Sequence, residues 1–299
     1  MTSQVDKAVS VLNKGGIIIF PTDTAFGIGC RIDKAESVER LFEIRKRPKN
    51  QATPVLVSSI VMARNYFLEI PKEVEHKLVE KYWPGALTIV LPAKTKKVPE
   101  LVRGMQKSVG IRVPNNPTIL EIIKKTGVPI LGPSANMHGE NTPFKLEDLD
   151  KELVSKVDFV VKGEVALKNI STVIDCSVKP WKILRQGAIK ISDTVKNILF
   201  IDTSDNQKIE LGLVIEAKKY KEIVSLTALK REIVLNLIDK IIAKHNLNLK
   251  EITEIKVNNG PGSFTGLRAG ISIANALASI LNIPINGKKI GDLENAVYN

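Results

Sequence analysis

The sequence predicts an α/β fold in two units, and three observations point to it. The 299 residues are 43% hydrophobic, which is enough for one large or two ordinary buried cores. Short β-branched runs alternate with helical patterns from the start of the chain, as in sheets covered by helices. The pattern restarts after Ile191-Ser192-Asp193. We therefore expect one domain at residues 1–191 and a smaller α/β domain at residues 196–299.

The strands expected in the first domain are short apolar runs, mostly separated by short loops marked with Pro or Gly. They are Gly16–Phe20, which Pro21 interrupts, Thr53–Val57, Ala86–Leu91, Ser108–Val113, Val128–Gly132, Phe159–Val161, Thr172–Asp175 and Lys182–Leu184. Apolar residues at helical spacing predict helices at Glu36–Arg47, Ile60–Phe67 and Glu73–Trp83.

The second domain shows a similar alternation. We expect two strands from Asn197 onward, a long amphipathic helix at Thr227–His245, a strand at Glu254–Asn258 and a helix after Gly262. The connection near residue 192 is short, so the two domains are expected to pack together or to be tightly tethered.

Composition excludes several classes of protein. Cys30 and Cys176 are far apart and form no C-x-x-C pair, so no disulfide framework or zinc knuckle is expected. The three histidines, His76, His138 and His245, lack the spacing of metal ligands. The chain starts without a basic leader, and no window approaches eighteen uncharged apolar residues. We expect a soluble cytoplasmic protein.

The net charge of +12 lies mainly in residues 1–191. Such an excess attracts anions, either nucleic acid or a polyphosphate such as ATP, and charge alone does not choose between them. Solvated lysines that keep the protein in solution explain part of the excess equally well.

Polar residues follow one of the buried strands directly. The segment Pro21–Gly27 begins where the strand at Gly16–Phe20 ends, and α/β sheets hold ligands at the carboxyl ends of strands. Taken alone, this segment is explained better as a Pro-initiated turn stabilised by Thr and Asp.

Arginines in three distant segments strengthen the case for a binding site. Arg112 lies within an apolar strand, where an unpaired charge costs several kcal/mol, so it needs an acid of the fold or an anionic ligand. Arg45-Lys46-Arg47 ends a helix, where the macrodipole also favours cations, and Arg185 ends a strand. With the small polar groups of Gly132–Asn136 and Ser171–Asp175, they suggest an anion pocket.

These segments carry a family resemblance. The motifs are P-T-D-T-A-F-G (21–27), R-K-R-P (45–48), P-G-A-L-T (84–88), G-I-R-V-P (110–114), P-S-A-N (133–136), S-T-V-I-D (171–175) and L-R-Q-G (184–187). In this order they resemble the YrdC-type threonylcarbamoyl-AMP synthases over residues 5–191. The resemblance implies an open twisted sheet with a basic cavity. It also implies synthesis of threonylcarbamoyl-AMP and pyrophosphate from L-threonine, bicarbonate and ATP, for tRNA N6-threonylcarbamoyladenosine.

The resemblance also implies roles for individual residues, with Arg45 standing where the family usually has Lys. Arg45, Lys46 and Arg47 match catalytic positions. Threonine-binding positions are matched by Thr24, Ser58, Arg112, Gly132 and Ser171, and ATP-binding positions by Arg47, Thr53, Ser108, Ser134, Asn136, Thr142 and Arg185. Mg²⁺ is expected to arrive on the phosphates of ATP, with no metal held by the protein.

The second domain carries a separate resemblance. I-D-T-S (201–204) and G-P-G-S-F-T-G-L-R (260–268) resemble the amino-terminal subdomain of the TsaB family, an inactive relative of the actin/ribonuclease H-like fold. This implies docking of a TsaD-like transferase and its ATPase partner, a possible dimer, indirect or weak contact with tRNA, and no membrane. The Gly260–Gly266 loop lacks the G-K-[ST] of a Walker motif, and a tight turn capped by Ser263 explains it better than an anion site.

Three other functions are compatible with parts of this pattern. An RNA-binding module would use the basic first domain, although aromatic residues are only 5% of the chain. A carbamoyl-AMP step in hydrogenase maturation would be expected beside zinc modules with C-x-x-C pairs, which this chain lacks. A non-catalytic scaffold of the same tRNA modification complex is the third.

Overall fold

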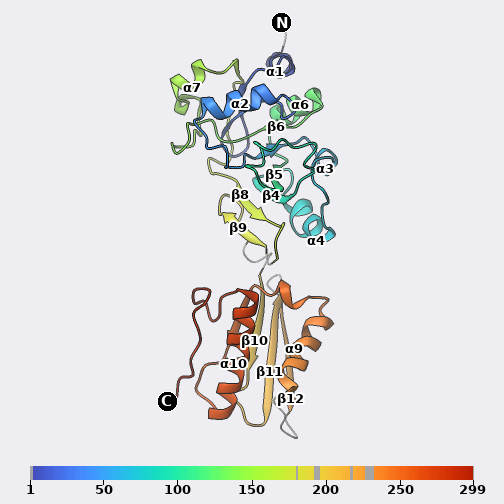
Figure 1. Cartoon of the computed structure of the whole chain (residues 1–299), viewed down its shortest axis with the longest axis vertical. Coiled ribbons are helices and arrows are strands. Elements are labelled where there is room, and N and C mark those ends of the chain that lie inside the picture. Colours follow the sequence, from blue (N-terminus) through green and yellow to red (C-terminus); the bar gives the residue numbers. More distant parts are fainter. Residues whose placement is uncertain (1–2, 180, 192–195, 216–217, 226–231, 299) are drawn as a thin grey trace. The chain divides into compact units, whose positions relative to one another are not determined.

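The computed structural model describes residues 3–179, 181–191, 196–215, 218–225 and 232–298. The chain forms two compact units, Met1–Lys190 and Ile191–Asn299 (Figure 1). Two expected features, the connection near residue 192 and the first turn of the helix predicted from Thr227, lie outside the described residues.

The first unit contains many short elements. Its helices are α1 (Gln4–Asn13), α2 (Ala35–Ile44), α3 (Ile60–Arg64), α4 (Lys72–Val74), the π-helical η1 (Glu75–Val79), α5 (Glu80–Tyr82), α6 (Pro117–Thr126), the 3₁₀ turn η2 (Leu146–Asp148) and α7 (Lys151–Ser155). Its strands are β1 (Ile18–Pro21), β2 (Phe26–Gly29), β3 (Val55–Leu56), β4 (Leu87–Pro92), β5 (Ser108–Arg112), β6 (Ile130–Leu131), β7 (Phe159–Val160), β8 (Thr172–Asp175) and β9 (Lys182–Arg185).

Two sheets form the frame of this unit, which confirms the predicted α/β class. The larger sheet has the strand order β6-β3-β5-β4-β8-β9, and the smaller one has the order β2-β1-β7. In the larger sheet β3 runs parallel to β5 and β4 runs parallel to β8, while the other pairs are antiparallel. Isolated bridges from Gly27 to Ser134 and from Arg31 to Ile130 connect β2 with the segment around β6.

Helix α6 shows how local sequence builds this unit, although the sequence analysis did not predict it. The Asn116 side chain caps the helix by accepting a hydrogen bond from the Ile119 amide, and Gly127 ends it in the left-handed conformation (φ 69°). Ile119, Ile122 and Ile123 form the buried stripe of an amphipathic helix. They share a core with α1 and β1.

Helix α2 ends earlier than the sequence predicts. The expected helix ran to Arg47, but the last helical residue is Ile44, and Lys46 has a positive φ of 51°. The prediction was wrong at this end because apolar periodicity carries no signal for a change of backbone hand. Arg45 and Arg47 therefore lie beyond the helix and not within its last turn.

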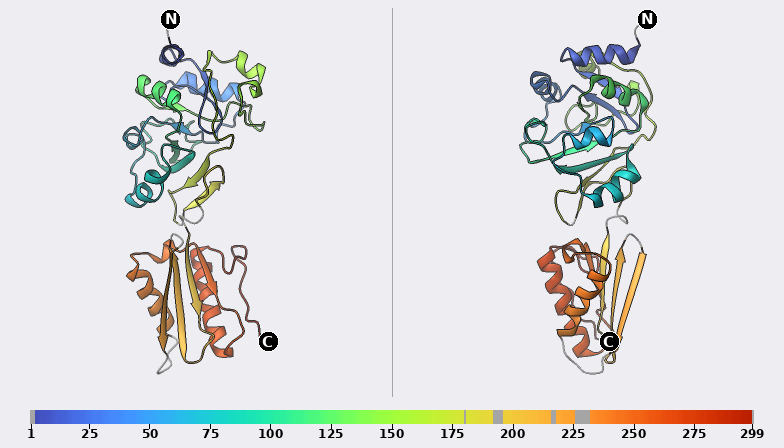
Figure 2. Two further views of the ribbon diagram at one scale, coloured as in Figure 1. Left: turned by 180° about the vertical axis from the view of Figure 1, so that it is seen from behind. Right: turned by 90° about the vertical axis from the view of Figure 1, so that its right-hand side faces the viewer.

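The second unit is a sheet with helices on one face (Figure 2). Its strands are β10 (Asn197–Asp202), β11 (Lys208–Ile215), β12 (Lys218–Ser225) and β13 (Glu254–Val257), and their order is β12-β11-β10-β13. The described helices are α9 (Glu232–Lys244), the 3₁₀ turn η3 (Leu249–Glu251) and α10 (Phe264–Leu281). Leu199 and Leu213 from the sheet share one buried core with Ile241 of α9 and Leu267 of α10.

Helix α10 is long and apolar enough to cross a membrane, judged by length and composition alone. In the structure its Leu267, Ile271 and Ala274 are buried in the core of the second unit, and the helix contacts β10 and β13. The side chain of Arg268 lies over the ring of Phe264. A helix that forms part of a protein core meets the same length and composition test.

Candidate functional site

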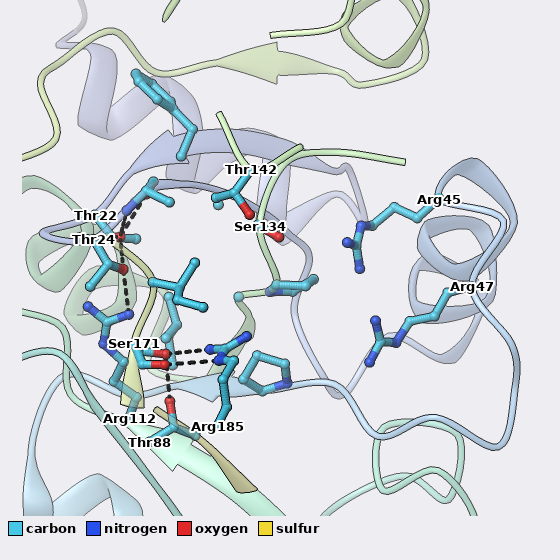
Figure 3. Close-up of a pocket in the computed structure, with 18 residues that line it drawn as sticks. Thr22, Thr24, Arg45, Arg47, Thr88, Arg112, Ser134, Thr142, Ser171 and Arg185 are labelled. Carbon is cyan, nitrogen blue, oxygen red and sulfur yellow. Dashed lines mark hydrogen bonds between the residues drawn. The ribbon is translucent and has the colours of Figure 1, made fainter. Parts of the chain in front are cut away.

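A polar cleft in the first unit is lined by residues from many separate segments (Figure 3). It encloses about 130 Å³ and, counted with its open mouth, contains about 660 Å³ of empty space. The smaller volume is below that of a typical pocket for a drug-sized molecule. Its polar and charged lining consists of Thr22, Thr24, Arg45, Arg47, Thr88, Arg112, Ser134, Thr142, Ser171 and Arg185.

Arg112 forms a buried ion pair at one side of the cleft. It is the last residue of β5, and its Nη2 donates to Oδ1 of Asp23, 89 positions away in the sequence. Nη1 donates to Thr24 Oγ1 at 2.7 Å, and Nε donates to the Gly85 carbonyl at 2.8 Å. Burial lowers the pKa of Arg112, and Asp23 opposes this. From the sequence the partner of Arg112 was open between an acid and a ligand, and in the structure the partner is an acid, Asp23.

The turn between β1 and β2 is stabilised by hydrogen bonds between its own side chains and backbone. Thr22 Oγ1 donates to the Ala25 carbonyl at 2.7 Å and accepts from the Thr24 amide at 3.1 Å. This is the stabilised turn that the segment alone suggested. The turn also carries Asp23, so it holds the counter-charge of Arg112. We call Asp23, Thr24 and Arg112 the paired side of the cleft.

Arg185 lies in the middle of the cleft wall, at the end of β9. Its Nε donates to the Ser171 carbonyl at 3.0 Å and its Nη2 donates to Ser171 Oγ at 2.9 Å. Ser171 Oγ also lies 3.2 Å from Thr88 Oγ1. These bonds fix the guanidinium and occupy only part of its five N–H groups.

Arg45 and Arg47 form the opposite side of the cleft, which we call the open side. Nε of Arg45 donates to the Asn136 carbonyl at 3.0 Å, and its Nη1 is buried without a hydrogen-bond partner. Arg47 donates to the carbonyls of Gln51 and Ala52. Figure 3 shows both side chains pointing toward the centre of the cleft.

The open side and Arg185 carry positive charge that no acid among the described residues matches. Within the described parts of the chain, Arg45, Arg47 and Arg185 make no ion pair with Asp or Glu. Burial, and then the neighbouring charge of Arg47, lowers the pKa of Arg45 to about 10. Burial also lowers the pKa of Arg47 and of Arg185. All three are still cations at neutral pH, so the cleft is built to receive an anion.

The structure brings together nine of the site residues expected from the sequence. They are Thr24, Arg45, Arg47, Arg112, Gly132, Ser134, Thr142, Ser171 and Arg185. Gly132 has a packing reason to be glycine, because an added Cβ would lie 2.3 Å from Cγ of Leu56.

Five expected residues do not line the cleft. Ser108 lies at the other end of β5 from Arg112, and Ser58 Oγ lies against the sulfur of Met62. The amide of Asn136 donates to the carbonyls of residues 137 and 140. Thr53 is buried, with an unpartnered Oγ1. Lys46 is exposed. Motif position carried no information on where each of these side chains points.

Three residues were missed as site residues although they lie in the quoted motifs. Thr22 and Thr88 line the cleft, and Asp23 neutralises Arg112. Thr88 had a recognisable signal, because it is a hydroxyl inside the apolar run Ala86–Leu91. Asp23 had none beyond its neighbours, since nothing local identifies a partner so distant in sequence.

The described residues include no group of three or more His, Cys, Asp or Glu side chains placed to hold a metal ion. Among the residues that the structure describes, Asp23 is the acid that forms an ion pair with a cleft residue, and Arg112 occupies one of its oxygens. Its other oxygen, Oδ2, is buried without a partner.

Comparison with known proteins gives a clear result for the first unit. The sequence model of the Sua5, YciO and YrdC family, described as telomere recombination, matches residues 10–187. The threonylcarbamoyl-AMP synthase of Bacillus subtilis is 30% identical over 187 residues, which are 62% of this chain and 54% of that protein. The uncharacterized protein YciO of Escherichia coli is 29% identical over 61% of this chain and 88% of YciO. The chain thus spans about half the length of the Bacillus synthase.

Structural comparison extends the likeness beyond the first unit. The crystal structure of Pyrococcus abyssi Sua5 complexed with L-threonine has a TM-score of 0.59 and 21% identity, and it covers 94% of this chain and 88% of that one. This likeness concerns the fold. A second family model, for the tRNA N6-adenosine threonylcarbamoyltransferase TsaD, matches residues 227–288, where the sequence analysis had found a resemblance to TsaB.

Proposed function

The chain belongs to the Sua5, YciO and YrdC family through residues 10–187, and from that membership we propose that it makes threonylcarbamoyl-AMP from L-threonine, bicarbonate and ATP. The observation that carries the proposal is a group of three arginines on one cleft, Arg45, Arg47 and Arg185, for which the described residues supply no acid partner. A nucleotide polyphosphate is the ligand class that such a group fits best. The synthase activity of the Bacillus relative supports the same reading.

The two sides of the cleft suggest two parts of the substrate set. We assign threonine to the paired side, where Arg112 keeps two N–H groups beyond its three hydrogen bonds. Because Asp23 already neutralises Arg112, this side suits a zwitterion better than a polyanion. We assign the phosphates of ATP to the open side, with the hydroxyls of Ser134 and Thr142 as further donors. Arg185 lies between the two and can contact either.

The reaction then needs little acid–base chemistry from the protein. The threonine amine captures CO₂ derived from bicarbonate and loses a proton, and a carbamate oxygen attacks the α-phosphorus. The bond from that phosphorus to the bridging oxygen breaks, and pyrophosphate leaves. Fixed guanidinium groups stabilise the charge that moves onto the leaving phosphates. Mg²⁺ would enter bound to ATP.

The second unit suggests a role in delivery of the product. We propose that residues 196–299 form a TsaB-like, actin/ribonuclease H-like subdomain that docks a TsaD-type transferase, and the match to the TsaD model supports kinship with that machinery. Tethering would raise the local concentration of an unstable mixed anhydride near the transferase. If separately expressed halves supported tRNA modification as fast as the whole chain, tethering would have no kinetic value.

The reaction itself is tested by pyrophosphate release from the full chain, with threonine, bicarbonate and ATP omitted in turn. Release that requires all three supports the synthase. Release without threonine, or no release at all, contradicts it, and the second result would favour the scaffold or RNA-binding alternatives.

A further inference from the structure

Arg45 and Arg47 point into one cleft although they are two positions apart at a helix end. Successive residues of an α-helix are rotated by about 100°, so residues two apart face nearly opposite sides. Arg45 keeps right-handed torsion angles (φ −83°, ψ −2°), so a strand-like alternation does not explain the shared direction either. The residue between them has to redirect the chain.

Lys46 provides that change of direction. Its φ is 51°, and two hydrogen bonds close the helix around it, from the Arg47 amide to the Phe42 carbonyl at 2.9 Å and from the Lys46 amide to the Glu43 carbonyl at 3.0 Å. This pair defines a Schellman motif with a left-handed residue just beyond the helix cap. The motif places Arg45 at the cap and Arg47 immediately after the turn.

Other helices of this chain end with the same pair of bonds, but with a different residue at the turn. After α1 the left-handed residue is Gly15, after α9 it is Asn246, and after α10 it is Asn282. Glycine and asparagine adopt this conformation at low cost, whereas a lysine is disfavoured by its Cβ. Among these helix ends, the one that faces the cleft carries the unfavourable residue, and strained backbone concentrates at functional sites.

Lys46 itself is not part of the cleft. The side chain is exposed and is absent from the cleft lining. It contributes, after the hydrogen bond and the charge of Lys156, to lowering the pKa of Glu152 on α7. Its position in the R-K-R-P motif therefore does not make it a cation of the site.

We infer that Lys46 is a positioning residue, and that its left-handed backbone aims Arg45 and Arg47 at the same polyanion. The loop from 136 to 138 supports this arrangement, because the Asn136 carbonyl accepts from Arg45 Nε and the His138 amide donates to the Arg45 carbonyl at 2.9 Å. The inference rests on the proposed function in that the polyanion is the triphosphate of ATP. It differs from the sequence expectation, which counted Lys46 among the catalytic cations.

The experiment uses the full chain and separates the effect of the left-handed backbone at residue 46 from the effect of the Lys46 charge. Lys46→Gly and Lys46→Asn remove the ammonium and keep a residue that accepts the left-handed turn, whereas Lys46→Val removes the ammonium and disfavours the turn. We expect Lys46→Val to raise the KM for ATP about tenfold or more with little change in the KM for threonine, and the other two variants to stay within about twofold of wild type. Binding of inorganic tripolyphosphate, measured by calorimetry, should follow the same order.

Asn246→Val is the matched control, because it strains the same motif in the second unit. It should leave tripolyphosphate binding unchanged. If Lys46→Val does not fold, Lys46→Ala replaces it as the milder strained variant. Equal losses of tripolyphosphate affinity in Lys46→Gly, Lys46→Asn and Lys46→Val would show that the ammonium acts directly. No loss of affinity in Lys46→Val would show that the left-handed turn does not matter. Either result overturns the inference. Wild type that binds tripolyphosphate but releases no pyrophosphate would contradict the proposed synthase and leave the comparison of variants intact.

Discussion

Buried arginines have different partners on the two sides of the cleft. On the paired side Arg112 is buried with Asp23 and Thr24, so its charge is largely satisfied by the fold. On the open side Arg45 is equally buried, yet one of its nitrogens has no partner, and Arg47 lies beside it. A paired charge supports structure, whereas an unpaired one is tolerated when a ligand supplies the missing anion. The same side chain thus has a counter-charge within the fold on one side and leaves room for an anionic ligand on the other.

The largest effect is expected where the paired side is broken. Asp23→Ala leaves the Arg112 guanidinium buried without a counter-charge, and we expect a loss of about 3–5 kcal/mol in the free energy of unfolding. Urea denaturation followed by circular dichroism measures it. The double variant Asp23→Asn with Arg112→Met should recover much of this stability but not the activity. A loss below about 1 kcal/mol in Asp23→Ala would mean that water reaches the pair.

A smaller effect in free energy, but a large change in the rate of pyrophosphate release, is expected when Arg47 on the open side or Arg185 between the two sides is replaced. Arg47→Ala or Arg185→Ala removes one fixed donor to the phosphates and should slow pyrophosphate release by about 10²-fold or more, by analogy with the loss of an oxyanion donor. Steady-state assays with saturating threonine measure this. Unchanged turnover in either variant would remove that arginine from the reaction.

Substitution of an arginine on the open side should change the free energy of unfolding only a little. Arg45→Met removes a buried, unmatched charge but also leaves the Asn136 carbonyl without its donor, so we expect the free energy of unfolding to stay within about 1 kcal/mol of wild type. The same urea experiment tests it beside Asp23→Ala. A loss as large as that of Asp23→Ala would erase the distinction between the two sides.

The smallest expected effect is a pH dependence of anion binding. Burial lowers the pKa of Arg45 from its ordinary value of 12.5 to about 10, so the folded protein loses this proton at a pH where an unfolded arginine keeps it. Affinity for tripolyphosphate should therefore fall more steeply above about pH 10 in wild type than in Arg45→Met. The unfavourable contribution of the buried charge to stability disappears over the same range. Parallel pH profiles would mean that Arg45 is not the titrating group.

Sequence reasoning succeeded where the information is local. The α/β alternation followed from strand-length apolar runs such as Ala86–Leu91, and nine of the fourteen expected site residues line one cleft. Sequence reasoning failed where the position within a strand or the orientation of a side chain decides whether the residue reaches the cleft. Ser108 belongs to the same strand as Arg112 but lies at its far end, and Asn136 turns its amide to its own loop. A motif specifies neighbours along the chain and not the orientation of each side chain.

What the sequence determined by itself is the inventory: arginines and hydroxyls placed at the ends of apolar segments, in a chain able to bury them. Only the tertiary structure decided which arginine meets an acid, because Asp23 and Arg112 are 89 positions apart and lie on segments of two different sheets. It also decided the ending of α2, where Lys46 is left-handed and the neighbouring Arg45 is held by hydrogen bonds to the distant residues Asn136 and His138. Local chemistry depends on residue type, whereas the pairing of charges depends on distances that exist only after folding.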